Sequence, residues 1–108
     1  MTATDRLQTL LSILESDPND AFCLYGIAQE YSTRGDDENA LIYYDRAIES
    51  DPNDAYSYFH KGRSLQRLNR IEEAIDTLKA GITAARNQND HHAISELDGY
   101  LQELSTQS

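Results

Sequence analysis

The chain has 108 residues, about the length of one domain. Nineteen acidic residues against nine Lys and Arg give a formal net charge of −10, and 39% of the residues are hydrophobic. This apolar share excludes a disordered acidic tail, and the negative charge argues against binding to nucleic acid or to an anionic membrane surface, because both require a basic protein surface.

The first expected helix covers residues 5–16. The sequence of this segment, DRLQTLLSILES, places four leucines on one helical face: Leu7, Leu10, Leu11 and Leu14. No apolar run in the chain approaches the roughly 20 residues of a membrane helix, and the N-terminus has no secretory signal pattern. The single cysteine, Cys23, has no second cysteine for an internal disulfide. These features predict a cytoplasmic protein.

A repeat of 34 residues follows the first helix. The seven residues ESDPNDA occur at 15–21 and again at 49–55, and the same offset matches Ala40 with Ala74. A seven-residue identity is very improbable by chance in a chain this short. The repetition therefore predicts an array of similar structural units.

Each period predicts two helices. In the first period, Asn19 or Asp20 is expected to cap a helix that runs to about Thr33, because a short polar side chain accepts an unpaired N–H of the first turn. Gly35 follows in a position that suits the left-handed conformation ending a helix. A second helix is expected over residues 37–50.

The second period predicts helices near 54–68 and 71–85, with Asn69 in the place of Gly35. Residues 90–104 form the last expected helix, in which four apolar residues recur at helical spacing: Ile94, Leu97, Leu101 and Leu104. This segment also carries Ser95, Glu96, Asp98 and Glu103, as in a terminal helix with one face in water.

Small and large apolar residues alternate along both periods, as packed helices require. The first period has Leu24, Ile27, Ala28, Tyr31, Ala40, Tyr44 and Pro52, and the second has Tyr58, Gly62, Leu65, Ala74 and Leu78. With these residues the chain resembles the tetratricopeptide repeat family. Lys61 stands where the family places Leu, and either extends its stem along the core edge or marks a distorted helix. Arg86 replaces the final Pro, which indicates that the array ends there.

The resemblance implies an all-α fold, a tetratricopeptide-like superhelix of helical hairpins. This α-solenoid is expected to have about six helices, the last of them a C-terminal capping helix. We expect one domain over residues 1–108, with a half-repeat helix at 4–16, full repeats at 17–50 and 51–85, and the capping helix at 89–105.

The resemblance also implies a function, because the first helices of successive repeats in this family line a concave groove that binds a peptide or a partner helix. The expected role is a non-catalytic adaptor or scaffold in protein binding. The groove residues are expected to be Phe22, Tyr25, Gln29, Tyr56, Phe59, His60, Arg63 and Arg67. The family's carboxylate clamp uses Lys and Asn, but those places hold Tyr25, Gln29 and His60, so that clamp is not expected.

The charge is unevenly distributed along the chain. Residues 1–54 carry a net charge of −9, yet residues 60–70 contain four bases and no acid. His60, Arg63 and Arg67 are spaced to share one helical face. These bases either pair with the acidic first half or form a positive patch for an acidic peptide or a C-terminal carboxylate. For a patch, Arg63→Glu with Arg67→Glu is expected to weaken partner binding without changing helicity.

The sequence contains no convincing catalytic or metal-binding grouping. Cys23 is expected to pack as a small apolar residue, and His92 with Glu96 to form a surface pair. The acids at 36–38 are expected to cap a helix, since negative charge is stabilised at a helix N-terminus. We therefore predict no enzyme, no cofactor and no metal ion.

An alternative function stays open, that of a self-associating structural repeat protein which stacks through its terminal helices. The face expected to mediate such stacking carries Ile94, Leu97, Tyr100 and Leu101. The expected oligomeric state is a monomer or a weak homo-oligomer.

Overall fold

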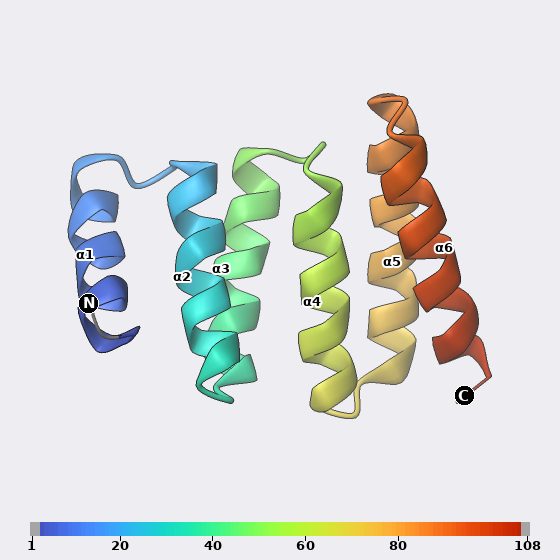
Figure 1. The fold of residues 1–108 in the computed structure, drawn as a ribbon, viewed down its shortest axis with the longest axis horizontal. Helices are drawn as coiled ribbons and strands as arrows, with labels where there is room; N and C mark the ends of the chain where they lie inside the picture. Colours follow the sequence, from blue (N-terminus) through green and yellow to red (C-terminus); the bar gives the residue numbers. More distant parts are fainter. Residues whose placement is uncertain (1–2, 107–108) are drawn as a thin grey trace.

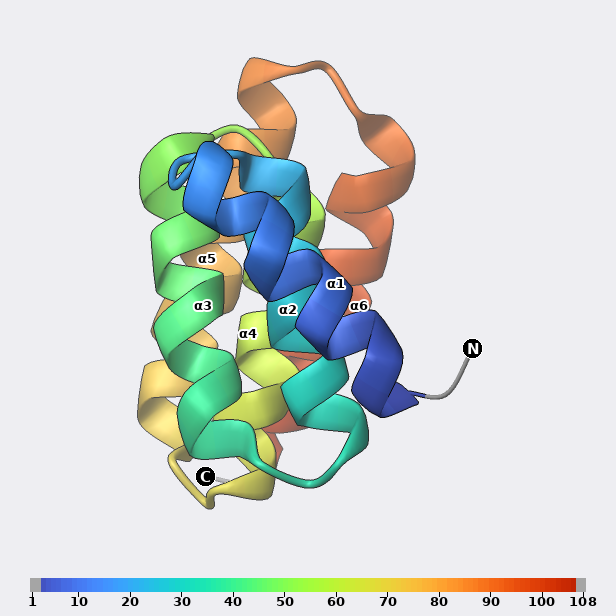
Figure 2. The same cartoon turned by 90° about the vertical axis from the view of Figure 1, so that its left-hand side faces the viewer.

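A computed structural model describes residues 3–106, which fold into six α-helices joined by short loops (Figure 1). The helices are α1 (Ala3–Ser16), α2 (Ala21–Thr33), α3 (Asp37–Ser50), α4 (Ala55–Arg67), α5 (Ile71–Asn87) and α6 (His91–Ser105). Consecutive helices run antiparallel in one row, with α1 and α6 at its ends. Seen along the row, α3 and α5 form one layer, and α2, α4 and α6 form the other (Figure 2). The expected all-α repeat superhelix is confirmed.

Aspartate side chains cap four of these helices. The carboxylates accept hydrogen bonds from backbone N–H groups in the first turns of α2, α3, α4 and α6, and they belong to Asp20, Asp36, Asp54 and Asp90. Three residues that follow helices have positive φ angles, namely Gly35 (78°), Asn69 (60°) and Asn89 (55°). The first two confirm the expected helix ends, whereas α5 continues two residues beyond the expected 85 because Asn89 takes the left-handed position.

Two glycines allow α4 and α5 to approach closely. A Cβ atom added at Gly81 would lie 2.7 Å from Cβ of Tyr58, and one added at Gly62 would lie 3.0 Å from Cδ2 of Leu78. Both distances are too short for an unstrained side chain. These two glycines therefore lie where the backbone of one helix meets a side chain of the neighbouring helix.

Lys61 lies within α4 without interrupting it. Its side chain is half-buried, and Nζ lies 2.7 Å from Oδ1 of Asp45 on α3. Of the two expectations for this residue, the extended stem at the edge of the core is the one observed.

The inner face of α6 belongs to the hydrophobic core. Leu97 is 1% exposed, and Ile94, Tyr100 and Leu101 are half-buried against the core that also includes Leu65, Leu78 and Ile82. The chain's own helices therefore bury Leu97 and part of the other three side chains, and stacking through the terminal helices stays an untested alternative. None of the helices in residues 3–106 is long and apolar enough to cross a membrane.

Candidate functional site

The helices α2, α4 and α6 share a common register, which the aspartate caps define. Counted from Asp20, Asp54 and Asp90, equivalent positions on the three helices can be matched. Four sets align expected groove residues with positions on α6: Phe22, Tyr56 and His92; Tyr25, Phe59 and Ser95; Gln29, Arg63 and Gly99; and Thr33, Arg67 and Glu103. Helix α6 is therefore in register with α2 and α4, whereas the sequence pattern predicts it only as a cap.

Four aromatic rings form a continuous row across these helices. Tyr25 on α2 and His60 on α4 have ring centroids 5.7 Å apart, and His60 and Phe59 are 5.4 Å apart. Phe59 in turn lies 5.3 Å from Tyr100 on α6. All four side chains are half-buried, so each ring keeps some accessible surface. We call Tyr25, His60, Phe59 and Tyr100 the aromatic row.

The two residues at the N-terminal end of this face are more exposed. Phe22 is 83% exposed and Tyr56 is 37% exposed, and they occupy equivalent positions at the starts of α2 and α4. Large apolar side chains gain free energy when they leave water. These two residues, both expected from the sequence, therefore extend the candidate contact surface beyond the aromatic row.

The side-chain amide of Gln29 bridges two tyrosine hydroxyls next to the aromatic row. Its Nε2 donates to the hydroxyl of Tyr25 at 2.7 Å, and its Oε1 accepts from the buried hydroxyl of Tyr44 at 2.9 Å. Burial raises the pKa of both tyrosines. The amide of Gln29 thus links Tyr25 to Tyr44, and its expected contact with a partner stays a prediction.

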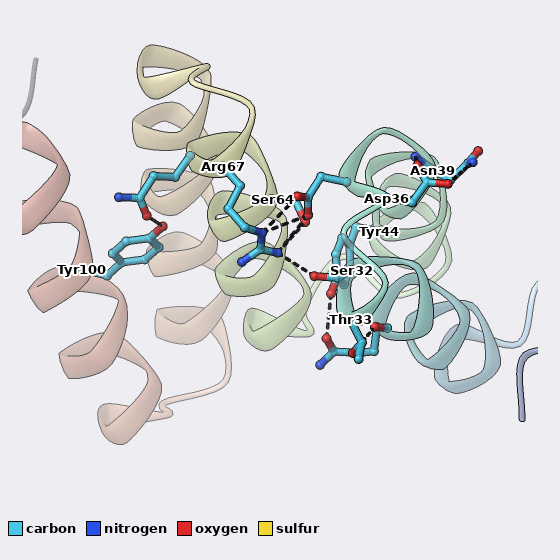
Figure 3. Close-up of polar contacts among 11 residues, drawn as sticks. Ser32, Thr33, Asp36, Asn39, Tyr44, Ser64, Arg67 and Tyr100 are labelled. Carbon is cyan, nitrogen blue, oxygen red and sulfur yellow. Dashed lines mark hydrogen bonds and ion pairs between the residues drawn. The ribbon is translucent and has the colours of Figure 1, made fainter. Parts of the chain in front are cut away.

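Arg67 joins three helices through polar contacts (Figure 3). Its Nε lies 3.1 Å from both carboxylate oxygens of Asp37 at the start of α3. Its Nη2 lies 2.6 Å from Oγ of Ser32 on α2 and 3.3 Å from Oγ of Ser64 on α4. Asp37 is only 7% exposed, and its hydrogen bonds raise the pKa of Arg67. We call these four residues the Arg67 clamp.

Most bases of residues 60–70 are paired with acids of the chain and do not form an open positive patch. Lys61 and Arg70 also pair with carboxylates, those of Asp45 and Glu73. Within residues 3–106, Arg63 is the one base of this stretch that forms no ion pair, and its guanidinium carbon lies 5.9 Å from the centroid of the Phe59 ring. Pairing with the chain's own acids thus accounts for three of the four bases.

The double substitution Arg63→Glu with Arg67→Glu does not test binding alone, because Arg67 forms an ion pair within the chain. Arg67→Glu would place a carboxylate beside the buried Asp37, and two adjacent carboxylates repel each other. A change in binding could then follow from a damaged fold. Arg63 alone is the suitable position for testing charge on this face.

His60 sits at the centre of the row and stacks on Tyr44, with ring centroids 6.4 Å apart. Burial lowers the pKa of His60, and the charges of Arg63 and Arg67 lower it further. The imidazole is therefore neutral near pH 7 and contributes an uncharged ring to the surface.

A pocket of about 410 Å³ opens between α4 and α6. Its lining residues are Phe59, Arg63, Gln66, Ser95, Glu96, Gly99, Tyr100 and Glu103. The five from α6 are absent from the expected groove set. The N-cap residue Asp90 is the sequence signal that could have found these five residues. Counting from Asp90 shows which residues of α6 are equivalent to the expected groove residues of α4.

The remaining reactive groups have structural partners. Cys23 is buried and its thiol donates to the carbonyl oxygen of Leu10 at 3.1 Å, and burial raises the pKa of the thiol. His92 pairs with Glu96 on the surface of α6, as expected. Among the described residues, no group of three or more His, Cys, Asp or Glu side chains is arranged to hold a metal ion.

Comparison with known proteins identifies the repeat. Two family models, each described as a tetratricopeptide repeat, match residues 23–54 and 43–76. A search of the curated proteins found no match. Among solved structures, a tetratricopeptide repeat domain protein from Salinibacter ruber is 33% identical, with a TM-score of 0.79. The alignment covers 85% of this chain and 93% of that protein.

Two more distant structures share the fold. The TPR2B domain of yeast Sti1, in a complex with pHsp70, has a TM-score of 0.91 at 22% identity, covering 98% of this chain and 85% of that one. The type III secretion translocator chaperone SycD from Yersinia enterocolitica has a TM-score of 0.89 at 15% identity, covering 97% and 73%. Together with the repeat matches and the Salinibacter protein, the six-helix architecture shows that the chain belongs to the tetratricopeptide repeat family.

Proposed function

We propose that the chain is a non-catalytic protein-interaction module that binds an extended peptide or a partner helix along α2, α4 and α6. The aromatic row carries this proposal. Its rings are held by neighbouring side chains and remain partly accessible, so a partner can bury them at little cost in side-chain entropy. The yeast Sti1 domain, which has the same fold, was solved in a complex with pHsp70, and this supports a binding role.

We further propose that the bound segment carries an acidic side chain or a C-terminal carboxylate opposite Arg63. This guanidinium is exposed, lies beside Phe59 and forms no ion pair within residues 3–106. A carboxylate there would gain charge-assisted, bidentate hydrogen bonds. The proposed acidic contact is thus one position of the partner, whereas the sequence alone suggested a patch from His60 to Arg67.

A displayed library of random dodecapeptides, selected against the immobilised protein, tests this function. We expect selected peptides, made synthetically, to bind with dissociation constants that Arg63→Glu raises about tenfold, because one charged contact is reversed. Fluorescence polarisation gives the constants, and circular dichroism checks that the variant keeps its helices.

Lys79→Glu is the matched control, since it makes the same charge change on an exposed position of α5, outside this face. It should leave the dissociation constants nearly unchanged. Failure to select any binding peptide would remove the proposed function. Equal effects of the two substitutions would remove the assigned role of Arg63.

A further inference from the structure

The pocket between α4 and α6 combines aromatic walls with unequal charge. Phe59 and Tyr100 contribute two rings whose centroids are 5.3 Å apart. Arg63 is the one cation in the lining, and Glu96 and Glu103 contribute two carboxylates from α6. The charged side chains in the lining therefore sum to a net charge of −1.

Neither carboxylate has a permanently charged base on its own helix. The segment His91–Ser105 contains no Lys or Arg, and Glu96 contacts His92, whose ring carries a positive charge only when it is protonated. Glu103 forms no ion pair within residues 3–106, although Arg63 lines the same pocket. Negative charge at this edge of the face is thus available to a ligand.

Gly99 keeps the pocket open between the carboxylates. Apart from its chain neighbours and the backbone of its own helix, no heavy atom lies within 4 Å of the place where its Cβ would be, so the packing of this chain does not require a glycine there. Glycine within a helix costs about 1 kcal/mol relative to alanine. The open space above Gly99 lets the main chain of a bound segment approach α6 closely.

We infer that this pocket takes a Lys or Arg side chain of the bound segment, which rests on the proposed peptide-binding function. The apolar stem would lie against Phe59 and Tyr100, and the cation would pair with Glu96 and Glu103. A pocket of about 410 Å³ falls in the size range of small-ligand sites and has room for one long side chain.

The partner is then a segment of mixed charge, with an acidic group for Arg63 and a basic group for the pocket. A uniformly acidic peptide would meet the two glutamates of α6 and the field of a chain with a net charge of −10. A basic residue is attracted both by these glutamates and by the negative net charge of the chain. Charge complementarity of this kind fixes the direction and register in which a segment binds.

Parallel selections from one random dodecapeptide library test the inference. Peptides selected by the wild-type chain should share a Lys or Arg at one recurring position, and Gln there should weaken binding about fivefold, as for a partly exposed ion pair. With Glu96→Lys and Glu103→Lys combined, the same position should instead favour Asp or Glu.

The matched control combines Glu72→Lys and Asp76→Lys, which change the net charge equally on exposed positions of α5. This variant should retain the preference for a basic residue. If the pocket lysines disturb folding, Glu96→Gln with Glu103→Gln is used, and it should abolish the preference without creating an acidic one.

The outcomes separate the two proposals. Peptides that bind, and weaken with Arg63→Glu, but show no basic preference would overturn the pocket assignment and leave the groove function intact. A basic preference that survives in the Glu96→Gln, Glu103→Gln variant would overturn it as well. A library from which no peptide binds the wild-type chain would remove the groove function, and the pocket assignment with it.

Discussion

Helix α4 has two junctions on the groove side, and they are built differently. Toward α2 and α3, the Arg67 clamp closes the junction with a carboxylate that is almost fully buried. Toward α6, the hydroxyl of Tyr100 donates to Gln66 (Figure 3). The ring of Phe59 packs on Tyr100, and a pocket stays open beside them. The first junction is closed by a buried ion pair, and the second keeps an open pocket.

Equivalent positions make the contrast clear. Arg67 and Glu103 occupy the same place relative to the N-caps Asp54 and Asp90. Arg67 pairs with Asp37 of the same chain, whereas Glu103 lines the pocket. A charged residue at a groove position is therefore available to a partner only where neighbouring helices leave it unpaired.

Removal of the clamp carboxylate should have the largest effect. We expect Asp37→Ala to lower the free energy of unfolding by about 2 kcal/mol, because it leaves the Arg67 guanidinium without its charged partner. The cost stays below that of a fully buried pair, since Arg67 is partly exposed. Urea unfolding followed by circular dichroism measures the change.

Glu38→Ala controls for the loss of negative charge in the same helix turn. Glu38 is exposed, so this change should cost only a few tenths of a kcal/mol through the helix dipole. Equal losses for the two variants would mean that the clamp does not hold the first junction together.

A pair of glycines compares a closely packed helix contact with the open pocket. We expect Gly81→Ala to lower the free energy of unfolding by about 1–2 kcal/mol, since its Cβ would meet Tyr58 and Leu97. Gly99→Ala should raise it by about 0.5–1 kcal/mol, because the methyl group enters open space and alanine favours the helix. Opposite signs in thermal or urea unfolding support an open pocket, and destabilisation by both contradicts it.

The smallest effect concerns pH. Because the pKa of His60 in the folded chain lies below its unfolded value of about 6.5, its contribution to stability is complete above that pH. It is lost as the pH falls through the lowered folded-state pKa, where the ring gains a proton beside Arg63 and Arg67. Between pH 7 and pH 5, the wild-type chain should therefore lose more stability than His60→Phe.

Urea unfolding at a series of pH values measures this difference. His91 and His92 are exposed and present in both proteins, so their contributions cancel. Parallel curves for the two chains would show that the surroundings of His60 do not oppose its protonation.

Local signals account for most of the fold. The heptapeptide ESDPNDA contains the aspartates that cap α2 and α4, and Gly35 and Asn69 take the left-handed conformation at helix ends. These devices act within one turn of a helix, so the sequence shows them directly. The end of α5 was placed too early because Asn89, which closes it, lies outside the repeated pattern.

The candidate site was only partly predictable. The side chains of Phe22, Tyr25, Tyr56 and Phe59 lie on the expected face, because helical spacing alone determines which residues share a side. The role of α6 was not expected, since its sequence does not continue the 34-residue period.

The sequence by itself determined the helices and their caps, since these depend on residues close together in the chain, and the repeat family, since its 34-residue period is visible in the sequence. Only the tertiary structure decided which charges remain available. Arg67 forms an ion pair with Asp37, which is thirty residues away in sequence. Arg63, four residues from Arg67, forms no ion pair within residues 3–106. Pairing of this kind depends on how closely the helices pack and on which side chains meet there. For the same reason, the pocket beside α6 exists only in the assembled superhelix.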